Sequence, residues 1–344
     1  MTGGNLGAPA APDFQGTYLF AGSNGYDGQF YRAIAHDPGL ERGYFLDSPL
    51  RYRRILVPAM AWLLALGNPW RIDAAYIAVI FGFVFLGAYG IARWAVLHGQ
   101  SAGWSLGFLA IPSTIVSVAR MTPDVALAAL CSWWVLYAEE ATTWKPYSLL
   151  VVVPFVRETG LLLNAAAAIG QAQAREFRRA GLVLATLIPY AVWWVVVSMR
   201  TRPDATNWFV YVPGAGILNA FRRVPAERAD LPMREIIMVF DYMALFGIVL
   251  AAALAVYVWH RNRNDKLALA ALSFSLLMLA TGRDDVWAHV FSFGRVFSPL
   301  LLLLGMCAIA RRHTLLLIPL LLILPRLTAE LAPLSLGVLR GLSR

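Results

Sequence analysis

Long apolar blocks, separated by polar turns, are the feature that most limits what this chain can fold into. Of its 344 residues, 59% are hydrophobic and only 14% are charged, whereas a soluble domain carries about a quarter charged residues. A helix that crosses a bilayer needs about twenty apolar residues, and blocks near this length recur along the chain. The pattern predicts an all-α, polytopic transmembrane helical bundle that forms a single membrane domain, residues 1–344.

About ten spans are expected, at residues 72–94, 104–118, 123–137, 146–156, 159–174, 182–199, 236–259, 267–281, 287–310 and 314–332. Two of them are short and meet at Arg157-Glu158, which indicates abbreviated helices joined at a polar point. Residues 55–67 are too short to cross and predict a helix lying in the membrane interface. Thr122 before Pro123 is typical of a helix N-cap, and Pro189 predicts a kink.

Three basic turns indicate the orientation of these spans. They hold Arg175, Arg178 and Arg179; Arg261, Arg263 and Lys266; and Arg311 and Arg312. The predicted topology puts all three turns on one side, and the positive-inside rule makes that side cytoplasmic. The chain then divides into an outside catalytic loop (1–54), N-terminal helices (55–199), a second outside loop (200–235) and C-terminal helices (236–344). A plain count of Lys and Arg favours the opposite orientation, because the two long loops are rich in arginine.

The net charge of +9 does not indicate nucleic acid in a chain of this kind. In a membrane protein, basic residues anchor cytoplasmic turns and contact phosphate groups, so we expect the lipid bilayer as a partner and no nucleic acid. The two cysteines, Cys131 and Cys307, lie inside apolar blocks, where a free cysteine behaves as a small hydrophobic residue. We therefore expect no disulfide and no metal site at these positions.

The polar segment at residues 25–56 concentrates the residues that could carry chemistry. Acids, aromatic residues and clustered arginines lie together there, just before an apolar run. Such residues can hold a sugar and a phosphate at a membrane surface, although an ordinary solvated loop has a similar composition. The candidates in this segment are Tyr26, Asp27, Gln29, Tyr31, His36, Asp37, Arg51, Arg53 and Arg54.

Four stretches together resemble the bacterial GT-C superfamily of membrane glycosyltransferases. They are YDGQFYRAIA (26–35), DSPLRYRRILVPAMAWLLALG (47–67), RMTPD (120–124) and RETG (157–160). The nearest similarity is to cell-surface glycopolymer-formation proteins with a YDGQFY-type first loop. The stretch from Arg51 to Leu64 also resembles the end of the first lumenal loop in glycosylphosphatidylinositol mannosyltransferases. The resemblance covers the N-terminal half, and the C-terminal half only by hydropathy.

This resemblance implies an enzyme that takes a sugar from a polyprenyl-phosphate donor. The acceptor would be a cell-envelope glycan, glycolipid or protein at the outer leaflet of the bacterial inner membrane, with the site facing the periplasm. An acid in the first outside loop serves such enzymes as the base, and Asp27 matches it by position. The family also has a helix before this loop, so we expect either a longer reading frame upstream or a partner helix in that place.

Each acid has a second interpretation. Asp27 is expected to be the general base toward an acceptor hydroxyl, or else a turn-forming aspartate before glycine. Asp37 is a second catalytic candidate, or else Asp37-Pro38 ends a helix that begins near Gln29. His36 could bind a sugar hydroxyl or a phosphate beside it. No cofactor is expected, and a divalent metal is possible but not indicated by this weak set of ligands.

The arginine candidates and the remaining acids also have two interpretations each. Arg51, Arg53 and Arg54 could capture the donor phosphate or anchor lipid headgroups. Asp124 could line the site or simply favour the first turn of its helix. Arg157 and Glu158 could form a local ion pair or belong to the site, because charges between apolar helices need a partner or a cavity. Arg295, inside a predicted span near Arg283, Asp284, Asp285 and His289, is expected to be a second phosphate ligand.

Two other functions remain open at this point. A lipid-linked saccharide transporter, or flippase, would also have many spans with arginines in a cavity, but its polar residues should occur in both halves. A non-catalytic partner in an envelope-polymer complex is the third possibility.

Overall fold

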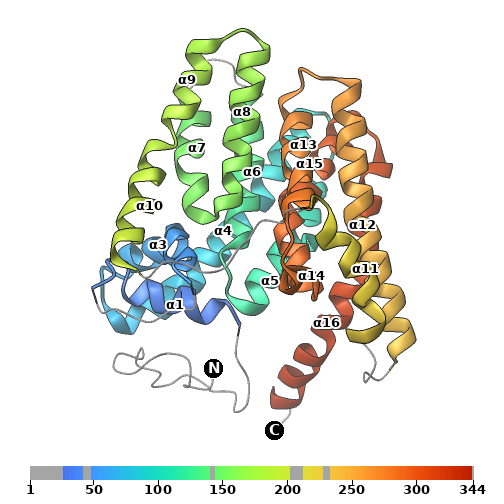
Figure 1. The fold of residues 1–344 in the computed structure, drawn as a ribbon. Coiled ribbons are helices and arrows are strands. Elements are labelled where there is room, and N and C mark those ends of the chain that lie inside the picture. Colours follow the sequence, from blue (N-terminus) through green and yellow to red (C-terminus); the bar gives the residue numbers. More distant parts are fainter. Residues whose placement is uncertain (1–25, 42–47, 140–143, 202–211, 228–232, 343–344) are drawn as a thin grey trace. The chain divides into compact units, whose positions relative to one another are not determined.

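The computed structural model describes residues 26–41, 48–139, 144–201, 212–227 and 233–342, and every regular element within them is helical (Figure 1). Its backbone contacts define two compact units. Unit 1 comprises Met1–Gly90 and Thr114–Thr206, and unit 2 comprises Ile91–Ser113 and Asn207–Arg344. Parts of both predicted outside loops (1–25, 42–47, 202–211 and 228–232) lie outside the described residues. The expectation of one domain stays a prediction.

Five helical stretches of the described chain are long and apolar enough to cross a membrane. They are α4 (Pro69–Leu97), Phe177–Arg200, α12 (Arg234–Arg261), α15 (Val290–Arg311) and Thr314–Pro333. A sixth is obtained if η1 (Ala102–Ala110) and α5 (Pro112–Arg120), which are bent by 59° at Ile111, are counted as one broken span. The all-helical prediction is confirmed for the described residues, and the candidate spans are compatible with a membrane protein, whereas ten spans are not confirmed.

The remaining apolar blocks form helices that are too short to cross alone. They are α6 (Asp124–Glu139), α7 (Lys145–Val156), α8 (Leu161–Gln173) and α13 (Lys266–Ala280). At 12 to 16 residues they reach roughly 18–24 Å, against a hydrocarbon core of about 30 Å. Polar residues set their ends: Asp265 accepts a hydrogen bond from the Leu267 amide at 2.8 Å where α13 begins.

Unit 1 combines these short helices with the polar N-terminal segment. The helices α1 (Gly28–His36), α2 (Leu50–Arg53) and α3 (Leu56–Leu64) pack together, and α10 (Ile188–Arg200) contacts α2. In Figure 1, α8 and α9 (Phe177–Ala185) run side by side as a hairpin. The break between α9 and α10 falls just before Pro189, as its sequence predicted. The interfacial helix expected at residues 55–67 corresponds to α3.

Unit 2 is built around α12 packed on α16 (Ile318–Leu342) and α13 packed on α15. Gly247 of α12 allows the first contact, because a Cβ there would press against the Pro319 carbonyl oxygen. The helices α11 (Ala215–Glu227) and α14 (Asp284–Trp287) contact each other. The indole of Trp94 donates to the Met306 carbonyl at 3.0 Å and fixes the last turns of α4 against α15.

Large apolar side chains remain exposed along the candidate spans. Phe85 of α4, Val192 of α10 and Phe246 of α12 are examples. Apolar side chains that point outward along a span contact hydrocarbon when the helix lies in a bilayer. The exposed residues therefore support the assignment of these helices to a membrane.

Candidate functional site

The start of α1 is held close to the turn that joins α5 to α6. Asp27 occupies the N-cap position of α1, and Gly28 packs so tightly that a Cβ there would overlap the Arg120 carbonyl oxygen. The Asp27 carboxylate pairs with Arg51 of α2 at 3.0 Å, and its side chain is 18% exposed. The helix expected after Asp27 is confirmed. The tight packing of Gly28 thus holds the partly exposed carboxylate of Asp27 close to the α5–α6 turn.

The α5–α6 turn has its own local supports. Met121 adopts a left-handed backbone with φ 52°, and its carbonyl accepts a hydrogen bond from the Tyr76 hydroxyl at 2.9 Å. The amide of Val125 donates to Ser117 Oγ at 3.0 Å. The side chain that satisfies this amide at the start of α6 is therefore Ser117, on the preceding helix, and not Thr122, which the sequence suggested as the cap.

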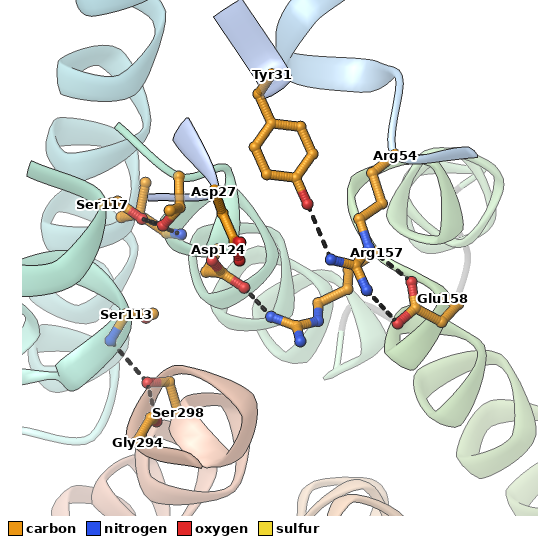
Figure 2. A network of polar contacts seen from close by, with 12 residues as sticks. Asp27, Tyr31, Arg54, Ser113, Ser117, Asp124, Arg157, Glu158, Gly294 and Ser298 are labelled. Atoms are coloured by element: carbon orange, nitrogen blue, oxygen red, sulfur yellow. Dashed lines mark hydrogen bonds and ion pairs between the residues drawn. The ribbon is translucent and has the colours of Figure 1, made fainter. Parts of the chain in front are cut away.

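Asp124 lies in the first turn of α6 and forms an ion pair with Arg157 (Figure 2). Their side chains are only 4% and 9% exposed. Arg157 follows the last residue of α7 in an extended conformation. Its Nε is buried and makes no hydrogen bond with the described residues. The pair therefore leaves one donor available in a buried position.

A second carboxylate and arginine lie in the same network. Arg54 binds both oxygens of Glu158, at 2.8 and 2.6 Å, and donates to the Tyr31 hydroxyl at 2.8 Å (Figure 2). Burial alone would raise the pKa of Glu158, but the charge and hydrogen bonds of Arg54 outweigh it and lower that pKa to about 2. Burial also opposes the charge on Arg54, yet Glu158 and Tyr31 raise the Arg54 pKa well above its usual value.

Each of the three clustered arginines contacts side chains of unit 1. Arg51 pairs with Asp27 and lies over the Phe30 ring at 4.8 Å. Arg53 lies over the Trp194 ring at 4.7 Å. Arg54 is engaged by Glu158. The sequence left open whether the three arginines capture the donor phosphate or anchor lipid headgroups, and in the structure each of them contacts side chains of unit 1.

Asp37 terminates α1, as the second interpretation of Asp37-Pro38 expected. One of its oxygens accepts the Glu41 amide at 2.8 Å, and the other accepts the Tyr52 hydroxyl at 3.4 Å. Its side chain is buried. These contacts give Asp37 a structural role at the end of the helix, and its proposed catalytic role has no further support.

His36 lies on the face of α1 that contacts α4. Its Nε2 is 3.1 Å from Asp73, which also accepts two hydrogen bonds from Arg32, at 2.8 and 2.7 Å. Arg32 and Asp73 are not among the residues predicted from the sequence. A partly buried ion pair fixes α1 there, so His36 takes part in docking the helix.

The other predicted residues are distributed between the units. The Arg120 guanidinium lies over the Tyr26 ring, 5.3 Å from the centre of that ring. Gln29 is half-buried on α1. Arg295 lies on α15 in unit 2. Near it in the sequence, Arg283 pairs with Asp285 at 2.5 Å and Arg223 pairs with Asp284 at 2.6 Å. His289 occupies the N-cap position of α15.

A buried charged cluster in unit 2 was also missed. Arg326 of α16 pairs with Asp241 of α12 and with Glu330, each at 2.6 Å, and both Arg326 and Asp241 are buried. The signal was present in the sequence, because Asp241 and Arg326 interrupt two predicted spans and ionisable residues are rare there without a role.

Among the described residues, no three His, Cys, Asp or Glu side chains gather as potential metal ligands. Cys131 of α6 and Cys307 of α15 are both buried and free.

A scan against protein-family models, a search of curated proteins and a search of solved structures each found no match. The resemblance seen in the sequence therefore stays a prediction.

Proposed function

We propose that this chain is an integral membrane glycosyltransferase that uses a polyprenyl-phosphate sugar donor. The observation that carries the proposal is the carboxylate of Asp27. It is partly exposed, paired with Arg51, and held at the start of α1 in the unit that also contains the Asp124–Arg157 pair. In Figure 2 the carboxylates of Asp27 and Asp124 point into the same region. The packing of Gly28 on the Arg120 carbonyl agrees with that placement.

Asp27 would act as the general base. The acceptor hydroxyl attacks the anomeric carbon of the donor sugar, and its proton passes to the Asp27 carboxylate as the new carbon–oxygen bond forms. The bond between that carbon and the phosphate oxygen breaks, and polyprenyl phosphate leaves with its charge. A phosphate leaving group needs little protonation, so one carboxylate is sufficient. The ion pair with Arg51, at 3.0 Å, holds this carboxylate in place at the start of α1.

Arg157 would hold the donor phosphate. Arg54 already places three hydrogen bonds on Glu158 and Tyr31, whereas Arg157 uses Nη1 for Asp124 and keeps a buried Nε. A guanidinium can bridge a carboxylate and a phosphate through its separate N–H groups. Arg157 thereby takes the role that the sequence assigned to the cluster of Arg51, Arg53 and Arg54. Arg295 stays a second candidate.

The remaining parts of the proposal concern the membrane, the acceptor and the orientation of the site. A polyprenyl donor lies in the bilayer, which matches a chain with several membrane-spanning helices. The acceptor would be a cell-envelope glycan, glycolipid or protein. The site would face the periplasmic side of a bacterial inner membrane, and the helix arrangement would be of GT-C type. The test is transfer of a labelled sugar from a polyprenyl-phosphate donor by the purified protein in nanodiscs.

A lipid-linked saccharide transporter is the second candidate, and the Asp241–Arg326–Glu330 cluster favours it. A transporter should carry polar residues in both halves, and this cluster lies within two spans of unit 2. Movement of a fluorescent lipid-linked saccharide between leaflets of proteoliposomes distinguishes the two functions. Movement that Asp241→Asn abolishes, without any sugar transfer by the wild type, would identify a transporter.

A further inference from the structure

An apolar cavity of about 210 Å³ lies within unit 2. It is enclosed by the end of α4, the 3-10 helix η1, the middle of α15 and the segment from Leu317 to Leu324. Its lining consists of leucine, isoleucine, methionine, phenylalanine, alanine and tryptophan side chains with two glycines. No charged or hydrogen-bonding group for a polar ligand is among them, apart from the Trp104 indole.

Two features of the chain create this space. The 59° bend between η1 and α5 tilts η1 away from the line of a continuous span, and Gly107 presents no side chain there, so that a Cβ would meet nothing within 4 Å. On the facing helix α15, a Cβ added at Gly305 would come only within ordinary contact of Leu317, at 3.8 Å. Ordinary core packing would fill such positions, and these glycines leave them open.

The cavity also reaches the exposed side of a candidate membrane span. Leu321 is part of its lining and is 59% exposed on a membrane-spanning stretch. By contrast, Met306 and Leu302 line the inner wall and are buried. Water does not occupy an apolar space of this kind. An empty cavity is destabilising, because the side chains that line it lose van der Waals contacts on that side. In a bilayer, hydrocarbon would be the medium at the open end.

We propose that this cavity is a binding site for the end of one acyl chain of a bilayer phospholipid. A cavity of about 150 Å³ holds one benzene molecule, so this one accepts a segment only a little longer than six carbons. That length suits the terminus of an acyl chain, and it would enclose only a small part of a polyprenyl chain. The bound chain fills the gap beside the broken span and replaces the packing that Gly107 and Gly305 omit. The proposal does not depend on the glycosyltransferase activity.

Photolabelling of the full chain tests this site directly. The protein is reconstituted in phosphatidylethanolamine and phosphatidylglycerol vesicles that contain a phospholipid with a diazirine at the end of its acyl chain. After illumination, labelled residues are located by mass spectrometry. We expect label on Met306 and Leu302, which the bulk bilayer does not reach. Leu303 and Leu304 are the internal controls, because they are buried on the same helix but do not line the cavity. They should stay unlabelled.

Two variants make the test independent of the wild-type pattern. Gly305→Leu should fill the cavity and reduce the label on Met306 to the level found at Leu303. Gly82→Leu is the matched control, since its Cβ also meets nothing within 4 Å but it lies outside the cavity. It should leave the label unchanged. If Gly305→Leu does not fold, Gly107→Leu replaces it.

The competing outcomes are distinct. Absence of label on Met306 and Leu302 in the folded wild type would overturn the site. Loss of that label when a small mole fraction of polyprenyl phosphate is added, but not when the same amount of unlabelled phospholipid is added, would overturn the acyl-chain assignment in favour of an isoprenoid chain.

Discussion

Asp124 and Arg157 form an ion pair across 33 residues of sequence, with both side chains buried. The pair joins the first turn of α6 to the end of α7, and the start of α1 packs on the turn that precedes it. Each charge compensates the other in a buried position. Removing either charge should therefore affect the stability of unit 1 as well as any chemistry there.

Asp124→Asn should lower the free energy of unfolding by about 3–5 kcal/mol, because it leaves the Arg157 charge buried without its partner. The measurement is thermal or denaturant unfolding of the protein in detergent. Glu176→Gln is the control. Its ion pair with Arg179 is exposed, and exposed pairs contribute about 0–1 kcal/mol. Equal stability losses in the two variants would contradict the assignment of a buried pair.

Gly28→Ala should destabilise the protein and displace Asp27. The new Cβ would overlap the Arg120 carbonyl oxygen, which belongs to backbone and cannot simply rotate away. Overpacking of this kind costs about 1–3 kcal/mol. At Gly39 the nearest atoms belong to the flexible Glu41 side chain, so Gly39→Ala is the matched control. Sugar transfer and melting temperature are measured for both, and a Gly28→Ala protein that matches the control in each would disprove the tight contact.

Glu158 predicts a dependence of stability on acid pH. Its folded-state pKa is lowered from 4.5 to about 2 by Arg54. The stabilisation from the Arg54–Glu158 pair is therefore complete above pH 4.5 and is lost as the pH falls through about 2. Wild type should be more stable than Glu158→Gln at pH 6, and the difference should shrink as the pH falls from 4.5 toward 2. A difference that stays constant across this range would show that the carboxylate is not held ionised by Arg54.

Arg157→Lys should weaken donor binding even though it keeps the positive charge. Ammonium cannot reproduce the planar contact of a guanidinium with a carboxylate and a phosphate. Loss of one charged hydrogen bond costs about 1.5–3 kcal/mol, which is at least about tenfold in Kd. Binding of a polyprenyl-phosphate sugar is measured by titration in nanodiscs, with Arg179→Lys as the exposed control. An unchanged Kd for a folded Arg157→Lys protein would remove Arg157 from the phosphate site.

Local features of this chain could be read from its sequence. The helix after Asp27, its end at Asp37-Pro38 and the break before Pro189 all depend on residues within one or two turns of each other. Composition was sufficient for the all-helical membrane class. The number of spans was not, because an apolar block of 12 to 16 residues has the same hydropathy whether it crosses the membrane or stops short.

The pairs that build the site could not be read in the same way. Arg54 meets Glu158 across 104 residues and Arg32 meets Asp73 across 41. Tertiary packing decides such pairs, and the local pattern around each residue contains no information about its partner. The cluster of Arg51, Arg53 and Arg54 shows this most clearly, since these three neighbours in sequence contact Asp27, Trp194 and Glu158 respectively.

The most direct test of the proposed function is sugar transfer by Asp27→Asn. Purified wild type, Asp27→Asn and Asp37→Asn are compared in nanodiscs with a labelled polyprenyl-phosphate sugar and an envelope acceptor, together with melting temperatures and donor affinity. General-base assistance is worth about 10²–10⁴-fold in rate, so Asp27→Asn should lose transfer by roughly this factor while it still binds donor. Asp37→Asn should lose less per folded molecule, because Asp37 ends a helix. Near-normal transfer by Asp27→Asn, or no transfer by the wild type, would contradict the account.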